Sequence, residues 1–281
     1  MTTHPWLVGP EAKLDRAIEH LETVKEACER FLKTQPFTVS TEFESEADCY
    51  VARFRQRREM PIAVGVIVGE VVHDLRSALE HVAWLLATAH ADDPAKLWEK
   101  GTREKITFPV AKKREHFDSH SLMEFISVPA QRVLDELQPH TRGNPYQVER
   151  HPLAALHDFW NVDKHRVVHG GIGEFDLSTT VSWTPMAIDV DELLNADVHV
   201  APLDPLTVGG QLSDGDAIAH VTFRGLENPP GTTKVEMAGQ PTARILFRAG
   251  DRAVSAQGLE GLSAYVATVL NEVRPLMPSS R

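Results

Sequence analysis

The sequence predicts an α+β fold, in which a helical bundle with an N-terminal β-hairpin is followed by a C-terminal antiparallel sheet closed by a final helix. Three long segments repeat apolar residues every three or four positions, which is typical of amphipathic helices. Short β-rich runs separated by Gly, Pro and Asp turns come later. We therefore expect residues 1–168 to form the bundle with its hairpin at 37–57. Residues 169–281 should form the β part, with a last helix that packs on the bundle.

The N-terminal part predicts one helix and one hairpin. From Gly9 to Gln35 the apolar residues have helical spacing, and Pro36 ends the pattern. Residues 37–43 and 50–57 then alternate apolar and polar side chains, as paired strands do. Arginines on one strand face glutamates on the other, so cross-strand ion pairs are favoured over a role in holding phosphates. These residues are Arg53, Arg55 and Arg57 opposite Glu42 and Glu44.

The segment Pro61–Ala91 predicts the helix around which the rest is organised. At about 100° per residue, one of its faces is apolar and the opposite face carries ionisable side chains but no lysine. A solvated helix face usually mixes Lys with Glu, so this face indicates a polar network held against a neighbouring element. It contains Gly69, Glu70, His73, Asp74, Arg76, Ser77, Glu80, His81 and Trp84.

A second helix with polar residues on several sides is predicted from His151 to His169. We expect it to lie beside the polar face of the central helix, with any active or binding site between the two. Its candidate binding residues are Asn161, Asp163, Lys164, His165 and Arg166. Between these helices, Ile106–Val110 predicts an extended piece and Pro129–Leu137 a short helix, while Lys112, Lys113 and Arg114 form a basic cluster typical of a solvated loop or helix start.

The C-terminal part predicts an antiparallel sheet and one helix. Apolar residues recur with helical spacing from Ala256 to Arg274, and Pro275 ends that pattern. The expected strands are Val167–Ile172, Thr179–Trp183, Asp197–Val200, Ala217–Arg224, Thr233–Ala238 and Ala243–Arg248.

Composition limits the class of protein. The 281 residues carry a formal charge of −11, which argues against broad affinity for phosphate backbones. No apolar run is long enough for a membrane span, and the N-terminus does not resemble a secretory signal. Cys28 and Cys49 make no disulfide framework, so we expect a reducing cytoplasm. There is no GxSxG, Walker or GxGxxG motif, and no cofactor is predicted.

Arg76 and His81 stand on the central helix with four residues between them. This spacing resembles the Arg-x4-6-His motif of HEPN ribonucleases, helical-bundle proteins of bacterial toxin and defence systems, although Ser77 and Glu80 depart from the family's usual pattern. The resemblance implies metal-independent RNA cleavage or RNA binding, with His81 in proton transfer and Arg76 on the phosphate. An imidazole that titrates near neutral pH and a bidentate guanidinium suit these roles.

His73 and Glu80 complete the candidate catalytic set. Arg76 and His81 are about 140° apart on an ideal helix, so they converge only through a kink or a second protomer. RNA and a second copy of the chain are therefore the expected partners.

Two other interpretations of the same polar residues stay open. In the first, a metal is bound between two helices, with His-Asp doublets similar to those of HD-type phosphohydrolases. The ligands would come from His73, Asp74, His81, His157, Asp158, Asp163 and His165. In the second, the protein is a non-catalytic interaction or scaffold protein, and its buried polar network only fixes how two helices pack. The segments LRSALEH and NVDKHR also resemble a recurring type of uncharacterised bacterial protein, from which no activity follows.

Overall fold

The structure, a computed structural model, describes residues 5–47, 49–176, 180–184, 197–203, 211–224, 234–238 and 242–278. Within these ranges it is an α+β protein, as predicted. The longer helices are α1 (Val8–Lys33), α2 (Ile62–His90), α4 (Val128–Glu136), α6 (Pro152–Asp163) and α8 (Ala256–Val273). One-turn helices are α3 (Arg114–Asp118) and α5 (Pro145–Glu149), and 3-10 turns include η2 (Pro94–Trp98), η4 (Ser121–Glu124) and η5 (Pro139–Thr141). The strands are β1 (Phe37–Glu44), β2 (Cys49–Gln56), β3 (His169–Asp176), β4 (Thr180–Thr184), β5 (Asp197–Pro202), β6 (Ala217–Arg224), β7 (Lys234–Ala238), β8 (Thr242–Ala249) and β9 (Arg252–Ser255).

The chain forms two compact units. The first contains residues 1–26, 62–169 and 248–281, and the second contains 27–61 and 170–247. The hairpin therefore groups with the C-terminal strands and α8 with the bundle, whereas the sequence-based division placed the hairpin in the first part.

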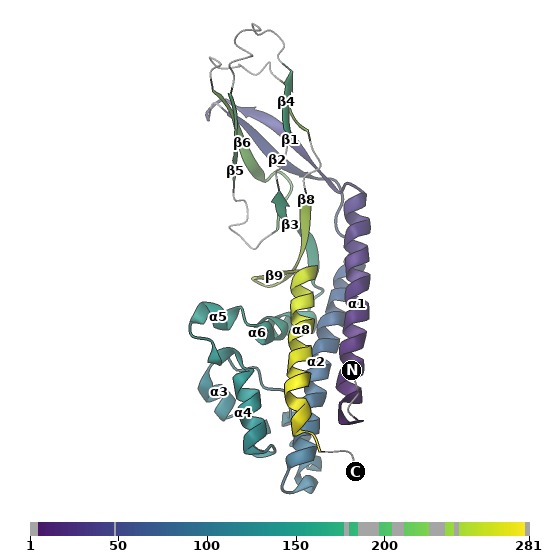
Figure 1. Cartoon of the computed structure of the whole chain (residues 1–281). Coiled ribbons are helices and arrows are strands. Elements are labelled where there is room, and N and C mark those ends of the chain that lie inside the picture. Colours follow the sequence, from purple (N-terminus) through teal and green to yellow (C-terminus); the bar gives the residue numbers. More distant parts are fainter. Residues whose placement is uncertain are drawn as a thin grey trace. The chain divides into compact units, whose positions relative to one another are not determined.

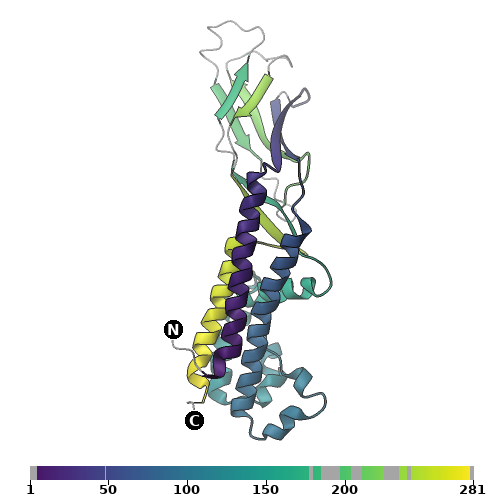
Figure 2. The same ribbon diagram turned by 90° about the vertical axis from the view of Figure 1, so that its right-hand side faces the viewer.

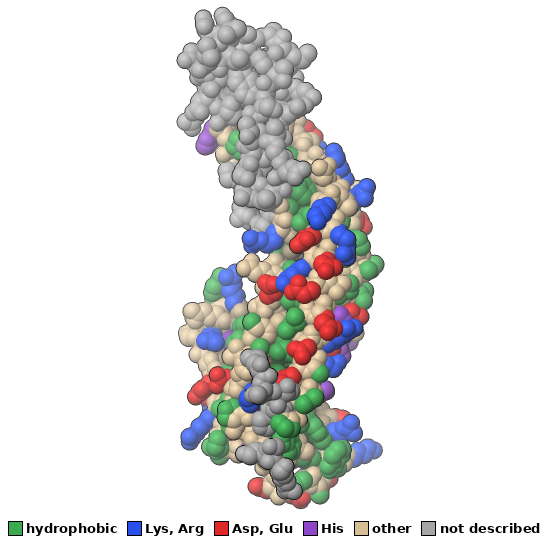
Figure 3. Space-filling view, turned by 45° about the vertical axis from the view of Figure 1, so that its right-hand side comes forward, with side chains coloured by type: hydrophobic (Ala, Val, Ile, Leu, Met, Phe, Trp, Pro, Cys, Tyr) green, Lys and Arg blue, Asp and Glu red, His purple; other side chains and the backbone are tan. Residues whose placement is uncertain are grey.

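The first unit is built around three long helices. In Figures 1 and 2 the part of α1 in this unit, α2 and α8 run side by side, with α1 antiparallel to the other two. The shorter helices α3 to α6 gather on one side of them in Figure 1. α2 is the central element because side chains on most of its circumference are buried, including Val68, Val72, Leu75, Leu79 and Leu86. On the face shown in Figure 3, acidic and basic side chains are interspersed.

The second unit contains a four-stranded antiparallel sheet in the order β1-β2-β6-β5. The predicted ion pairs across the hairpin are confirmed, because Arg53 pairs with Glu44 and Arg55 with Glu42. Strands β4 and β7 form a separate antiparallel pair. The prediction that a final helix closes a sheet is wrong, since no sheet is closed among the described strands and α8 belongs to the bundle unit.

The helix predicted up to His169 ends earlier, at Asp163. Residues beyond it include β-branched Val167 and Val168, which favour extended backbone, and strand β3 begins at His169. The early end lets the chain pack directly on α2, because a Cβ on Gly65 would lie 1.8 Å from the carbonyl oxygen of Val168. Only glycine allows this approach.

Candidate functional site

A cavity of about 640 Å³ lies between α1, α2 and the segment that ends α6. We call it the histidine pocket. It occupies the place between the central helix and the second polar helix where the sequence predicted a site. Its polar lining residues are Arg16 and His20 from α1, Glu70, His73 and Asp74 from α2, and Asp163, His165 and Arg166 from the end of α6 and the residues after it.

The wall between α1 and α2 is held by ionic contacts to Asp74. This carboxylate is buried, and Lys13 Nζ donates to its Oδ1 at 2.7 Å. His20 lies between two carboxylates, with Nδ1 3.4 Å from Asp74 Oδ2 and Nε2 3.7 Å from Glu70 Oε2. Asp74 therefore joins α1 to α2 at this wall of the pocket.

On the opposite wall, the absence of a side chain at Gly69 makes room for Asp163. A Cβ at this position would lie 2.1 Å from Asp163 Oδ1, so the carboxylate occupies the space that the missing side chain leaves on α2. Burial raises the pKa of Asp163, and the charge of a protonated His73 acts in the opposite direction. A half-buried carboxylate and an imidazole therefore face the same cavity.

The side chains of His73, His165 and Arg166 present polar groups to the cavity. His73 is exposed, and its Nε2 lies 3.4 Å from the hydroxyl of Ser77 one turn later. His165 and Arg166 are also exposed, and among the described residues neither side chain makes a hydrogen bond or ion pair. The pocket thus offers imidazoles and one unpaired guanidinium.

Arg76 lies elsewhere, in the packed interior. Only 4% of its surface is exposed, and its Nη2 donates to the backbone oxygen of Phe108 at 2.9 Å. It also pairs with Glu80, whose Oε2 accepts from the backbone N–H of Phe108 at 3.0 Å. The i,i+4 pair on α2 therefore binds both polar groups of one peptide residue in the extended segment 106–110. Burial lowers the pKa of Arg76, although an arginine stays protonated at neutral pH.

The ring of Trp160 joins this cluster to α6. The guanidinium carbon of Arg76 lies 4.9 Å from the ring centroid, and Lys164 Nζ lies 3.0 Å from it. Such cation–π contacts stabilise a cation that has lost solvent. The expectation that the polar face of α2 meets a neighbour is confirmed for Arg76 and Glu80, but the main partner is the backbone of Phe108.

The structure does not bring Arg76 and His81 together. His81 is exposed, and its Nδ1 lies 3.3 Å from where a Cβ on Gly9 of α1 would be. Arg76 points instead to Phe108 and Trp160. Of the candidate binding residues, Asp163, His165 and Arg166 line the histidine pocket, Lys164 covers Trp160, and Asn161 lines a different cavity.

Among the described residues, no three His, Cys, Asp or Glu side chains converge on a point that could hold a metal ion. The donor atoms named for the metal interpretation are divided between separate cavities and helix faces. None of the described helices is both long and apolar enough to cross a membrane. Comparisons with protein-family models, curated proteins and solved structures found no match for this chain.

Sequence reasoning missed three features of the bundle unit. Arg16 and His20 lie on the polar side of α1, a helix for which the sequence predicted no functional residue. The repeat of Gly65 and Gly69 at i,i+4 was the available signal for close packing on α2. The partner of Arg76 and Glu80 is main chain, so no side-chain pattern could reveal it.

Proposed function

We propose that this protein binds RNA in the histidine pocket and cleaves it without a metal. The observation that carries the proposal is the presence of His20, His73 and His165 in one open cavity beside the unpaired Arg166. Imidazoles titrate near neutral pH and can both accept and donate protons. The resemblance of the Arg76–His81 segment to HEPN ribonucleases also implies RNA as the substrate. The proton-transfer residues of this proposal are His73 and His165, however, and not His81.

The chemistry would be an internal transesterification. His73, which lines the same cavity as Asp163, would accept the proton of the ribose 2′-hydroxyl as its oxygen bonds to phosphorus. The bond from phosphorus to the 5′-oxygen breaks, and His165 would donate the proton that this oxygen takes up. Arg166 would bind the non-bridging oxygens through its planar donor pair. The products would be a 2′,3′-cyclic phosphate and a 5′-hydroxyl.

A reducing, cytoplasmic setting and a homodimer belong to the same proposal. The setting is supported by Cys28 and Cys49, which are buried and form no disulfide, and burial raises the pKa of Cys28 to about 11. A buried thiol of this kind is unreactive. The homodimer stays a prediction from the spacing of Arg76 and His81.

The second candidate is a non-catalytic interaction protein, and the buried Arg76–Glu80 pair favours it. This pair fixes the segment 106–110 against α2 and needs no ligand to explain it. In that case the histidine pocket would have no RNA-cleaving activity.

The test is incubation of mixed RNA with the protein in EDTA, followed by analysis of fragment ends. We expect wild-type cleavage that gives cyclic phosphates and falls by about 100-fold or more in His73→Gln and His165→Gln, the usual size of a lost general acid or base. His81→Gln is the matched control and should retain activity. Loss of activity in His81→Gln with retention in His73→Gln would instead support the HEPN-type site, and an inert wild type would remove both.

A further inference from the structure

A second cavity in the bundle unit shares no residue with the histidine pocket. We call it the basic pocket. Its volume is about 760 Å³, within the range of small-molecule sites. It lies between the segment after Pro109, the loop that joins η5 to α5, and α6. The lining residues used below are Lys112, Lys113, His116, Arg142, His157 and Asn161.

The two carboxylates at this pocket are already neutralised. Lys112 Nζ lies 2.7 Å from Glu149 Oε2 and 3.4 Å from Asp158 Oδ2. Arg252, from the strand that precedes α8, pairs with the same two carboxylates. Two negative charges therefore meet two positive ones, and this group contributes no net charge to the pocket.

The remaining basic side chains of the pocket are not paired with carboxylates among the described residues. Among the described residues, neither Lys113 nor Arg142 makes an ion pair, and Arg142 forms a side-chain hydrogen bond with the phenol of Tyr265, which carries no charge at neutral pH. The exposed imidazole of His116 lies beside them and can donate or accept a hydrogen bond. The pocket thus has a positive potential in a protein of net charge −11, which favours an anionic ligand.

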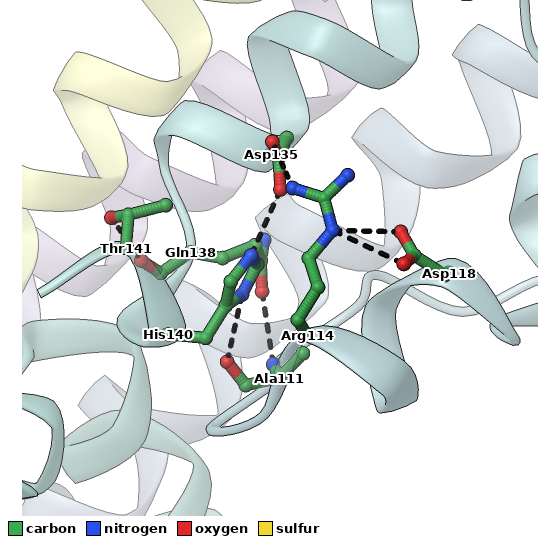
Figure 4. A network of polar contacts seen from close by, with 7 residues as sticks. All are labelled: Ala111, Arg114, Asp118, Asp135, Gln138, His140 and Thr141. Carbon is green, nitrogen blue, oxygen red and sulfur yellow. Dashed lines mark hydrogen bonds and ion pairs between the residues drawn. The ribbon is translucent and has the colours of Figure 1, made fainter.

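Hydrogen bonds join the chain segments that form two walls of the pocket, and Figure 4 shows the residues that make them. The backbone N–H of Ala111 donates to Gln138 Oε1 at 2.9 Å, and the backbone N–H of His140 donates to the oxygen of Ala111 at 3.1 Å. Asp135 accepts from Arg114 at 2.7 Å and lies 2.9 Å from His140 Nε2. These contacts join the segment that carries Lys112 and Lys113 to the one that carries Arg142, so the backbone of the two segments is held together beside the pocket.

The third wall offers uncharged polar groups. His157 Nδ1 is buried and has no hydrogen-bond partner, and the pKa of His157 is lowered by burial and by the nearby charge of Arg76. A neutral imidazole can donate or accept a hydrogen bond. Asn161, one turn further along α6, adds an exposed amide.

We propose that the basic pocket binds a small phosphorylated molecule of about nucleotide size, held by Lys113, His116 and Arg142. A phosphate group accepts several charge-assisted hydrogen bonds and matches this excess of donors. The proposal does not depend on RNA cleavage in the histidine pocket.

The test is isothermal titration of the full chain with inorganic pyrophosphate at low ionic strength, with sodium chloride at matched ionic strength as the control titration. We expect saturable binding at one site, with a dissociation constant below about 1 mM. Lys113→Gln/His116→Gln should weaken it about tenfold or more, as should Asn161→Asp, which adds a negative charge with almost no change of shape. Lys105→Gln removes an exposed lysine outside the pocket and should leave the constant within about twofold.

Circular dichroism melting curves establish that each variant is folded, and Asn161→Asp provides a second result if the double variant unfolds. Retention of pyrophosphate binding by His73→Gln would separate this site from the histidine pocket. Absence of saturable binding in the wild type would overturn the proposal. Equal binding by the wild type, the double variant and Asn161→Asp would also overturn it.

Discussion

Several side chains in the bundle unit, such as Arg76, Glu80 and His151, bind main-chain groups. His151 is an example, since it precedes α6 and its Nδ1 accepts from the backbone N–H of Leu153 at 3.2 Å. Its Nε2 lies 3.1 Å from the hydroxyl of Tyr265, which donates to the oxygen of Leu137 at 2.8 Å. This arrangement requires the neutral ring with its proton on Nε2.

His151 should make the protein sensitive to acid. Burial lowers its pKa to about 4, and the charge of Arg142 acts in the same direction. The unfolded chain, where the pKa is about 6.5, takes up a proton that the folded state does not. The free energy of unfolding should therefore fall as the pH drops from 6.5 to 4, by about 3 kcal/mol from this residue. Urea unfolding at pH 7 and pH 4.5 measures the fall.

The control for this prediction is His151→Asn, which keeps an acceptor for the N–H of Leu153 but cannot titrate. It should unfold more easily at pH 7 and show a smaller fall towards pH 4.5. The same pH dependence in both proteins would contradict the assignment.

At the scale of elements, Gly65 and Gly69 on α2 provide a matched pair. A Cβ on Gly65 would meet the backbone oxygen of Val168, which cannot move without the chain. A Cβ on Gly69 would meet only the carboxylate of Asp163, the end of a side chain that can rotate away. The two substitutions to alanine therefore have the same chemistry but different consequences.

Gly65→Ala should lower the free energy of unfolding by roughly 1–3 kcal/mol because of the forced separation. Gly69→Ala should be close to neutral, since alanine favours a helix over glycine by about 1 kcal/mol. It should nevertheless weaken ligand binding in the histidine pocket by displacing Asp163. Denaturant unfolding of both variants is the measurement, and equal destabilisation would argue against this packing.

The elements themselves were largely predictable. Periodic apolar residues marked α1, α2 and α8 to within two residues at each end, and alternation marked the β1–β2 hairpin. The end of α6 was misplaced because the polar residues 163–166 fit a helical pattern that tertiary packing on Gly65 overrides. The one-turn helices α3 and α5 are too short to show a period.

At the scale of the whole molecule, the sequence predicted the region of the candidate site but not all of the residues that line it. Both pockets lie in a unit assembled from three separate stretches of chain, and Arg16 and His20 reach the histidine pocket from the first of them. Nothing in the local pattern of α1 indicates which neighbour its polar side meets. Net charge was a weak guide too, because the basic pocket concentrates cations that the total of −11 conceals.

Arg76 holds the segment 106–110 against α2, whereas the proposed role of His73 is proton transfer in the histidine pocket. The most direct test compares Arg76→Gln with His73→Gln, measuring both the free energy of unfolding and RNA cleavage in EDTA at a temperature where each variant is folded. Arg76→Gln should lose about 3 kcal/mol of stability, because Glu80 loses its charged partner and the oxygen of Phe108 loses a donor, yet it should still cleave RNA. His73→Gln should keep its stability and lose cleavage. A stable but inactive Arg76→Gln beside an active His73→Gln would contradict the account.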